Sequence, residues 1–307
     1  MNENPAYDVV IVGGSAAGLS AALVLTRARR RVAVVDGGRP RNGPAAHMQG
    51  FLSRDGLPPA ELLALGRAEV EGYGGELVRD EVVEVASDSA GFLVRLAGGD
   101  VIAARRVLVA TGLRDEIPDV PGARERWGRD LLHCPYCHGF EVRDQPLGVL
   151  GGSTETVQHA LLVRQWSYDV VLFTDGFEPT DDERRRLAVR GIEVVQTPVV
   201  RLVVEQDALQ GVELQDGLVV ERSAVFVRPR FVPHSDLLVG LGCDTDEAGW
   251  PVVDATGRTT VPGIWAAGNV ADPRAQVITA AGAGSAAAIA INNDLVDEDV
   301  RLALTEP

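Results

Sequence analysis

Cysteine is scarce in this sequence, with three residues in 307, and two of the three form a single C-x-x-C pair, Cys134 and Cys137. Disulfide-stapled secreted domains are far richer in cysteine, so that class of protein is excluded. Long apolar runs are also missing. The longest alanine-rich stretch, residues 280–291, is broken by glycine and serine and is too short to span a bilayer. The first residues show no basic region before an apolar segment, so we expect a soluble cytoplasmic protein with no membrane partner.

Basic residues are also fewer than acidic residues. Lysine and arginine total 29 against 44 acidic residues, which gives a formal net charge of -15 and a sequence pI near 4.8. Nucleic acids and anionic membrane surfaces would be repelled, so neither is an expected partner. Hydrophobic residues make up 46% of the chain, enough for a large core, and the length suits two domains.

The first 36 residues predict a strand, a turn, a helix and a second strand. Residues 9–12 are a continuous apolar run, typical of a parallel strand that is buried on both faces. Residues 13–18 read GGSAAG, residues 19–30 are helical in pattern, and residues 31–35 suit a second strand that ends at Asp36. The order of these elements is that of a dinucleotide-binding unit.

The chemistry of such a unit depends on small residues in the turn. They let backbone amides approach a pyrophosphate at the helix start, while an acidic side chain about 20 residues later binds ribose hydroxyls. Serine stands where the usual pattern has its second glycine. A glycine-rich turn of an ordinary α/β protein is the alternative, but the complete order favours cofactor binding. The predicted cofactor-binding residues here are Gly13, Gly14, Ser15, Ala16, Ala17, Gly18 and Asp36.

A second unit of the same kind follows in the middle of the chain. Residues 147–150 are apolar, residues 151–156 read GGSTET, residues 157–166 suit a helix, and residues 169–173 suit a strand. The repetition predicts an α/β fold with two Rossmann-like domains. Thr156 occupies the last position of this second turn, where a side chain larger than alanine separates helix from strand.

Four motifs, taken in order, resemble the low-molecular-weight thioredoxin reductases, a family of FAD disulfide oxidoreductases. They are GGSAAG at 13–18, VLVATG at 107–112, CPYC at 134–137 and VPGIWAAGNV at 261–270. The resemblance covers nearly the whole chain. It implies a homodimer whose FAD-binding domain comprises residues 1–113 and 238–307. Inserted into that domain, residues 114–237 would form an NAD(P)-binding-like domain that carries the C-x-x-C pair.

The same resemblance implies further contacts to FAD. Asn269 stands where family members usually have aspartate, and its amide can still hydrogen-bond a hydroxyl. The FAD-binding residues implied in this way are Thr111, Gly112, Gly268, Asn269, Gln276 and Val277.

Three interpretations compete for the sequence HCPYCHGFE at 133–141. A zinc site would need four ligands, and although His133 and His138 flank the cysteines, each histidine abuts a cysteine, which hinders closure around one ion. A structural disulfide would close a very small loop and stabilise little. A redox-active pair fits best, because C-x-x-C spacing lowers the pKa of one thiol and makes the disulfide exchangeable. No metal is expected.

Roles within the pair follow from the resemblance. It implies that Cys137 faces the flavin and that Cys134 exchanges with substrate. His138 stands where reductases have an aspartate, and imidazole can take a thiol proton near neutral pH. We therefore predict Cys134, Cys137 and His138 as catalytic residues. No role is assigned to His133, and Cys243 is expected to be a buried filler.

The expected source of electrons differs from that of a reductase. Reductases of this family bind the 2′-phosphate of NADPH through arginines after the second Rossmann strand. Here residues 173–179 read FTDGFEP, with no arginine and two carboxylates. Arginines at 184–186 suit a solvated helix face, although they could reach a phosphate. We expect NADPH binding to be impaired, whereas Asp175 would suit the 2′-hydroxyl of NADH.

A subgroup of the family that lacks this motif oxidises the dithiols of sulfur-containing natural products such as holomycin and gliotoxin, and this chain is similar to it. The implied reaction converts a small-molecule dithiol into an intramolecular disulfide, with FAD as cofactor, O2 as electron acceptor and H2O2 as product. One alternative is an NAD(P)H-dependent reductase of a thioredoxin-like protein. Another is a non-catalytic flavin redox sensor.

Overall fold

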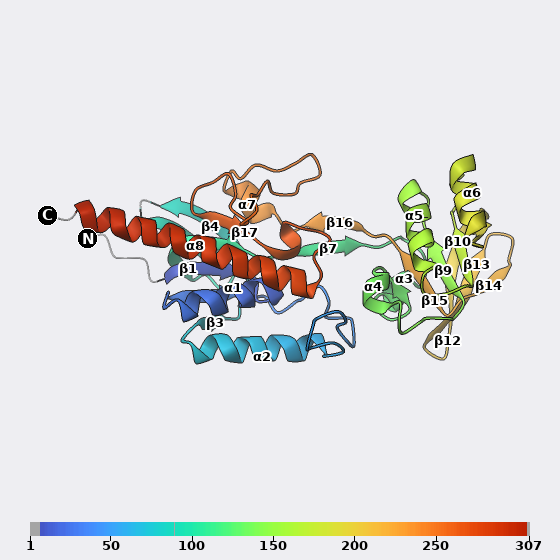
Figure 1. Cartoon of the computed structure of the whole chain (residues 1–307), viewed down its shortest axis with the longest axis horizontal. Coiled ribbons are helices and arrows are strands. Elements are labelled where there is room, and N and C mark those ends of the chain that lie inside the picture. Colours follow the sequence, from blue (N-terminus) through green and yellow to red (C-terminus); the bar gives the residue numbers. More distant parts are fainter. Residues whose placement is uncertain (1–6, 89, 306–307) are drawn as a thin grey trace.

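The computed structural model describes residues 7–88 and 90–305 and places them in two lobes that a two-stranded ribbon joins (Figure 1). The ribbon consists of β7 (Leu113–Glu116) and β16 (Arg230–Pro233), which pair antiparallel. None of the helices in these described ranges is both long and apolar enough to cross a membrane.

The first lobe is built on a seven-stranded sheet in the order β3-β2-β1-β6-β5-β4, with β17 also paired to β6. Its core strands are parallel, and β4, β5 and β6 form an antiparallel meander. The predicted strand at residues 9–12 is confirmed, and its four side chains are fully buried. The strands are β1 (Tyr7–Val12), β2 (Val32–Val35), β3 (Glu76–Val78), β4 (Val82–Asp88), β5 (Gly91–Leu96), β6 (Val101–Val109) and β17 (Ile264–Ala266).

Helices cover both faces of this sheet. On one face α1 and α8 lie side by side, so close that a Cβ atom on Gly284 of α8 would collide with the backbone of Ala17 (Figure 1). On the other face α7 packs its buried Leu238 against the sheet. The helices are α1 (Ala16–Arg27), α2 (Pro59–Gly72), α7 (Asp236–Gly240), the 3-10 turn η1 (Gly268–Val270) and α8 (Val277–Thr305).

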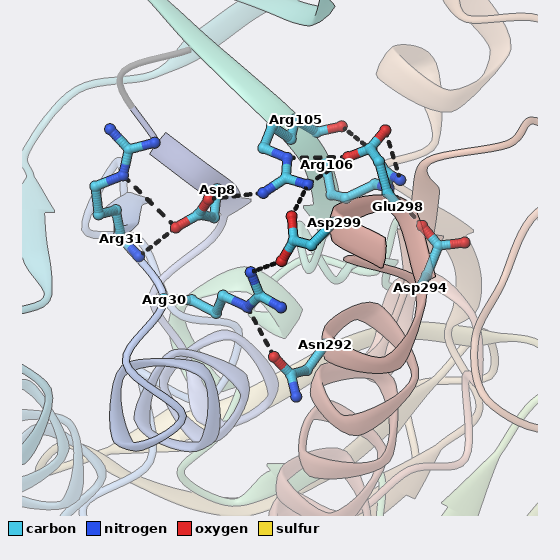
Figure 2. Close-up of polar contacts among 9 residues, drawn as sticks. All are labelled: Asp8, Arg30, Arg31, Arg105, Arg106, Asn292, Asp294, Glu298 and Asp299. Atoms are coloured by element: carbon cyan, nitrogen blue, oxygen red, sulfur yellow. Dashed lines mark hydrogen bonds and ion pairs between the residues drawn. The ribbon is translucent and has the colours of Figure 1, made fainter. Parts of the chain in front are cut away.

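Helix α8 is much longer than the small-residue stretch suggested, and ion pairs hold its far end (Figure 2). Arg105 from β6 lies at the centre of this cluster and forms ion pairs with Asp8, Glu298 and Asp299. Further pairs join Arg106 to Asp294 and Glu298, Arg30 to Asp299, and Arg31 to Asp8. Side chains from β6 and from the loop after α1 thereby fasten the last turns of α8 to the sheet.

The second lobe has a five-stranded parallel sheet in the order β11-β10-β9-β15-β8. A three-stranded meander, β12-β13-β14, covers one face, and α5 and α6 cover the other (Figure 1). The unit β9-α5-β10 repeats β1-α1-β2, as the two GGS turns predicted. The sheet strands are β8 (Leu131–Leu132), β9 (Leu147–Leu150), β10 (Val170–Phe173), β11 (Glu193–Val195) and β15 (Ala224–Val227). The meander consists of β12 (Val199–Glu205), β13 (Ala208–Leu214) and β14 (Val219–Glu221), and the helices are α3 (Ala123–Arg126), α4 (Pro135–His138), α5 (Thr154–Val163) and α6 (Asp181–Val189).

Candidate active site

The turn between β1 and α1 leaves the helix start open. Gly13 has a φ of 108°, and a Cβ atom there would strike the Ala110 carbonyl, while one on Gly18 would strike Gly13 O. Ser15 is the N-cap, yet its hydroxyl makes no capping bond within the described chain. The first intrahelical bond is donated by Leu19 N, so the amides before it point toward the open turn. This arrangement suits a bound pyrophosphate.

The other predicted cofactor residues of the first lobe converge on the same edge of the sheet. Asp36 directly follows β2, and a Cβ atom on Gly14 would lie 2.8 Å from its side chain. Gly268 follows β17, where a Cβ atom would lie 2.8 Å from that of Ala17. Ligands of open α/β sheets bind at this carboxyl edge of the strands. The turn, the acid and the β17 loop therefore fit one extended dinucleotide.

Thr111 and Gly112 follow β6 and are clasped by His234. The Thr111 hydroxyl donates to the His234 carbonyl at 2.7 Å, and the His234 amide donates to Gly112 O at 3.0 Å. These bonds fix the start of the ribbon beside the first-lobe turn. Gln276 and Val277, at the start of α8, lie near the loop that follows β2, since a Cβ atom on Gly50 would be 3.8 Å from the Gln276 amide oxygen.

Asn269 is oriented by its neighbours rather than free. Its side-chain nitrogen donates to the carbonyls of Asp272 and Ala275 at 2.9 and 3.0 Å. Its oxygen accepts a hydrogen bond from Arg41 at 3.2 Å. The Arg41 guanidinium also donates two hydrogen bonds to the Asp115 carboxylate of β7, at 2.8 and 2.6 Å. The amide therefore links the β17 loop to the ribbon.

The C-x-x-C pair lies on α4 at the edge of the second lobe (Figure 1). Cys134 and Cys137 are joined by a disulfide with their Cα atoms 5.2 Å apart. The amides of Cys137 and His138 both donate to Cys134 O at 3.1 Å, so a single helical turn holds the pair. Both cysteines are half-buried, and the neighbouring rings of Tyr136 and Phe140 are 64% exposed. A thiol-containing molecule can therefore approach the disulfide.

His138 is suited to accept a proton. Burial lowers the pKa of its imidazole below the ordinary value, and the nearby Glu141 carboxylate opposes this effect. The ring is consequently neutral at pH 7 and free to take up a proton. Glu141 also accepts a hydrogen bond from Gln49 of the first lobe at 3.2 Å. This bond joins the segment 133–141, which holds the cysteine pair, to the loop after β2.

The second turn, between β9 and α5, is filled by its own side chains. Ser153 caps α5 by accepting from the Thr156 amide at 3.3 Å, and its hydroxyl lies 3.2 Å from that of Thr156. Glu155 stands in the first turn of α5, where its own backbone amide, the Ser153 hydroxyl and the charge of Arg228 lower the pKa of its carboxyl. A carboxylate thus lies where the first lobe has an open helix start.

The acidic side chains of the loop after β10 also have partners within the second lobe. Asp175 accepts a hydrogen bond from the Val199 amide at 3.1 Å. Arg184 does approach this loop from α6, but it is paired with Glu178 at 2.7 Å. The other two arginines of the run are tied within the same region, Arg185 to Asp182 and Arg186 to Gln158. All three side chains lie on α6, as expected for a helix face.

Several residues of the site carried no signal in the sequence. Arg41 lies in an irregular loop, and its contacts to Asp115 and Asn269 come from distant segments. Glu155 could have been noticed as an acidic residue in the first turn of α5, a position that favours interaction with helix amides. Within the described ranges, no cluster of three or more histidine, cysteine or acidic side chains could hold a metal ion.

Comparisons with known proteins agree with this geometry. The family model for pyridine nucleotide-disulphide oxidoreductases matches residues 7–285. Thioredoxin reductase sirT of Leptosphaeria maculans is 31% identical over 96% of this chain and 96% of its own length. Thioredoxin reductase of Streptomyces coelicolor is 30% identical over 92% of each chain.

Two solved structures are similar over almost the whole chain. The crystal structure of HlmI has a TM-score of 0.94 and 61% identity, covering 97% of this chain and 95% of its own. A putative thioredoxin reductase, TrxB, from Bacillus anthracis has a TM-score of 0.91 and 36% identity, covering 95% and 99%. The chain therefore belongs to the pyridine nucleotide-disulphide oxidoreductase family, as a thioredoxin-reductase-like, FAD-dependent disulfide oxidoreductase.

Proposed function

We propose that this protein is a dithiol oxidase, which converts a small-molecule dithiol into an intramolecular disulfide with O2 as the electron acceptor and H2O2 as the product. One observation carries the proposal. The two helix starts that could bind a dinucleotide differ, because that of α1 is open whereas that of α5 is occupied by Ser153, Glu155 and Thr156. The chain is thus equipped for one dinucleotide cofactor.

We assign FAD to the first lobe, in a domain made of residues 1–113 and 238–307, and we assign the redox pair to an inserted domain of residues 114–237. Sheet membership supports this division, since the seven-stranded sheet draws on both ends of the chain. The glycine turn, Asp36 and the Gly268–Asn269 loop fit the cofactor's pyrophosphate, ribose and ribityl arm. When bound, FAD supplies a two-electron acceptor that can be reoxidised by O2.

The proposed exchange uses the side chains of α4. A substrate thiolate attacks Cys134 Sγ, a mixed disulfide forms, and Cys137 leaves as a thiolate. The neutral His138 takes the proton of the second substrate thiol and passes it to the Cys137 thiolate. The second substrate thiolate then attacks the substrate sulfur of the mixed disulfide and releases Cys134. The substrate loses two electrons and two protons, and the cysteine pair takes up both.

Two other functions have specific support. A reductase that uses NAD(P)H to reduce a thioredoxin-like protein is favoured by the relatives named thioredoxin reductase and by Arg184, which approaches the β10 loop. Two contacts oppose the reductase function. Glu178 already pairs with Arg184, and Asp175 already accepts a hydrogen bond from the Val199 amide of β12. A flavin redox sensor would use the same disulfide without turnover. We retain a cytoplasmic homodimer as the expected form, on the family resemblance.

Oxygen consumption tests the proposal. The purified holoenzyme, given a small dithiol and no nucleotide, should consume O2 continuously and produce one H2O2 for each disulfide formed. The Cys134→Ser variant should bind FAD and show no turnover, which controls for reaction of free flavin. A single reduction of the cysteine pair without sustained O2 uptake would favour the sensor, and uptake that requires NAD(P)H would favour the reductase.

A further inference from the structure

His133 stands directly before Cys134, at the end of β8, and one of its ring nitrogens is fixed. His133 Nδ1 lies 3.1 Å from the Val227 carbonyl of β15. A carbonyl oxygen can only accept, so Nδ1 carries the hydrogen and Nε2 is the bare acceptor. No residue of the described ranges hydrogen-bonds to Nε2, and this atom is not fully buried. Nε2 is therefore a basic nitrogen within reach of solvent.

The ring is held between the two lobes. It meets the edge of Phe231 on β16 with ring centres 5.1 Å apart, and it lies 5.8 Å from the His159 ring on α5. Arg41, which belongs to the first lobe, stacks on the same Phe231, with its guanidinium carbon 5.0 Å from the ring centre. The His133 ring therefore lies beside the ribbon, on the residue that directly precedes Cys134.

The charged and titratable groups that face the ring come from four other segments: His159 of α5, Arg41 of the loop after β2, Asp115 of β7 and Arg228 after β15. Burial lowers the pKa of His133 most. The Val227 carbonyl opposes this effect, and so, more weakly, does Asp115, whereas Arg41 and Arg228 add to the lowering. The imidazole is consequently neutral at pH 7 and can accept a proton.

The proposed exchange assigns no base to the substrate thiol that attacks Cys134. A thiol attacks only as its thiolate, and an ordinary aliphatic thiol is mostly protonated at pH 7. His138 follows Cys137 in the sequence and already serves the proton of that cysteine in the proposed exchange. We infer that His133 is the general base that deprotonates the substrate thiol attacking Cys134, an assignment that rests on the proposed dithiol exchange.

The step balances as follows. The proton of the first substrate thiol moves to His133 Nε2, and the substrate sulfur bonds to Cys134 Sγ as the Cys134–Cys137 bond breaks. Cys137 carries away the electron pair of that bond. The second substrate thiol gives its proton through His138 to the Cys137 thiolate, and its sulfur then closes the product disulfide. Cys134 leaves as a thiolate and takes the first proton from His133. The imidazole ends the cycle neutral.

The variant His133→Asn tests this role. Asparagine can still donate from its amide nitrogen to the Val227 carbonyl, but it has no group that replaces the basic Nε2. The measurement is the anaerobic single-turnover rate of the holoenzyme with dithiothreitol, followed by acid quench, alkylation and mass spectrometry of the reduced cysteines. We expect a loss of about 10²-fold at pH 7, in the range of general base catalysis. The deficit should disappear near pH 9.5, where the aliphatic thiol ionises without help.

A more acidic substrate gives a second test. Naphthalene-1,8-dithiol is an aromatic dithiol that ionises at lower pH and forms a five-membered cyclic disulfide, so the deficit of His133→Asn should be much smaller with it. His47→Asn is the matched control, because His47 Nδ1 also lies 3.0 Å from a backbone carbonyl, Gly56 O, whereas its side chain is exposed. This control should behave as the wild type with both dithiols.

A deficit in His133→Asn that stays the same across the pH range, or no deficit at all, would overturn the assignment. The readout counts reduced cysteines and does not depend on O2. Wild-type protein that exchanges with dithiols but never consumes O2 would therefore refute the oxidase function while leaving the role of His133 testable.

Discussion

Gly18 controls how closely α1 approaches the turn that precedes it. A side chain at this position would collide with Gly13 O, so the Gly18→Val variant should push the helix away from the pyrophosphate position. We expect colourless protein from this variant, measured as the ratio of flavin to protein absorbance. Gly282→Val is the matched control, since a Cβ atom there meets no described atom within 4 Å. Full flavin content in Gly18→Val would refute the placement of FAD.

His159 makes the second lobe sensitive to acid. It is 5% exposed, and its Nδ1 has no hydrogen-bond partner among the residues that the structure describes. Burial, followed by the charges of His133 and Arg228, lowers its pKa to about 3. An unfolded chain titrates this histidine near pH 6.5, so below that pH the unfolded state binds a proton that the native state does not. Stability is therefore lost as the pH falls from about 6.5 toward 3.

The expected loss attributable to His159 is about 2 kcal/mol between pH 6.5 and pH 5, because each pH unit contributes about 1.4 kcal/mol per proton. Urea unfolding at both pH values should show a smaller loss for His159→Leu than for the wild type. His47→Leu removes an exposed histidine and should leave the wild-type pH dependence intact. An unchanged pH dependence in His159→Leu would mean that the buried ring is protonated in the native state.

At the scale of elements, α8 depends on the ion pairs at its far end (Figure 2). The Arg105 side chain is only 15% exposed and serves three carboxylates. Arg105→Ala takes one partner from each of these carboxylates and leaves them with Arg31, Arg106 and Arg30. We expect a loss of about 2 kcal/mol in the free energy of unfolding, the range of hydrogen bonds to charged groups. Arg95→Ala is the control, because Arg95 and its partner Glu84 are 55% and 58% exposed. That change should cost less than about 1 kcal/mol, and equal losses in the two variants would contradict the structural role of the cluster.

The regular elements of both lobes could be predicted because they depend on local patterns. The apolar strands and glycine turns placed β1-α1-β2 and β9-α5-β10 correctly, although α5 begins at Thr154, before the predicted start. The length of α8 could not be predicted, because its polar second half is held by partners on β6 and in the loop after α1. The filling of the α5 start by Glu155 was missed for a similar reason, since it depends on how three side chains share the first turn.

At the scale of the whole molecule, the two lobes meet through contacts that no local pattern encodes. Arg41 from the first lobe touches Asn269, Asp115 of β7 and Phe231 of β16, and Gln49 bonds to Glu141 beside the redox pair. The cysteines and His138 were predicted because they are contiguous in sequence. The setting of His133 emerged only when β8, β15, β16 and α5 were placed together.

The central claim is that electrons enter from a dithiol and not from a pyridine nucleotide. The direct test mixes oxidised holoenzyme anaerobically with NADPH, NADH or a small dithiol and follows the flavin absorbance. We predict rapid bleaching by the dithiol and very slow bleaching by either nucleotide, because Glu155 and Ser153 occupy the α5 start and carboxylates line the β10 loop. Fast, saturable bleaching by NADPH or NADH at micromolar concentration would contradict the account and identify a reductase.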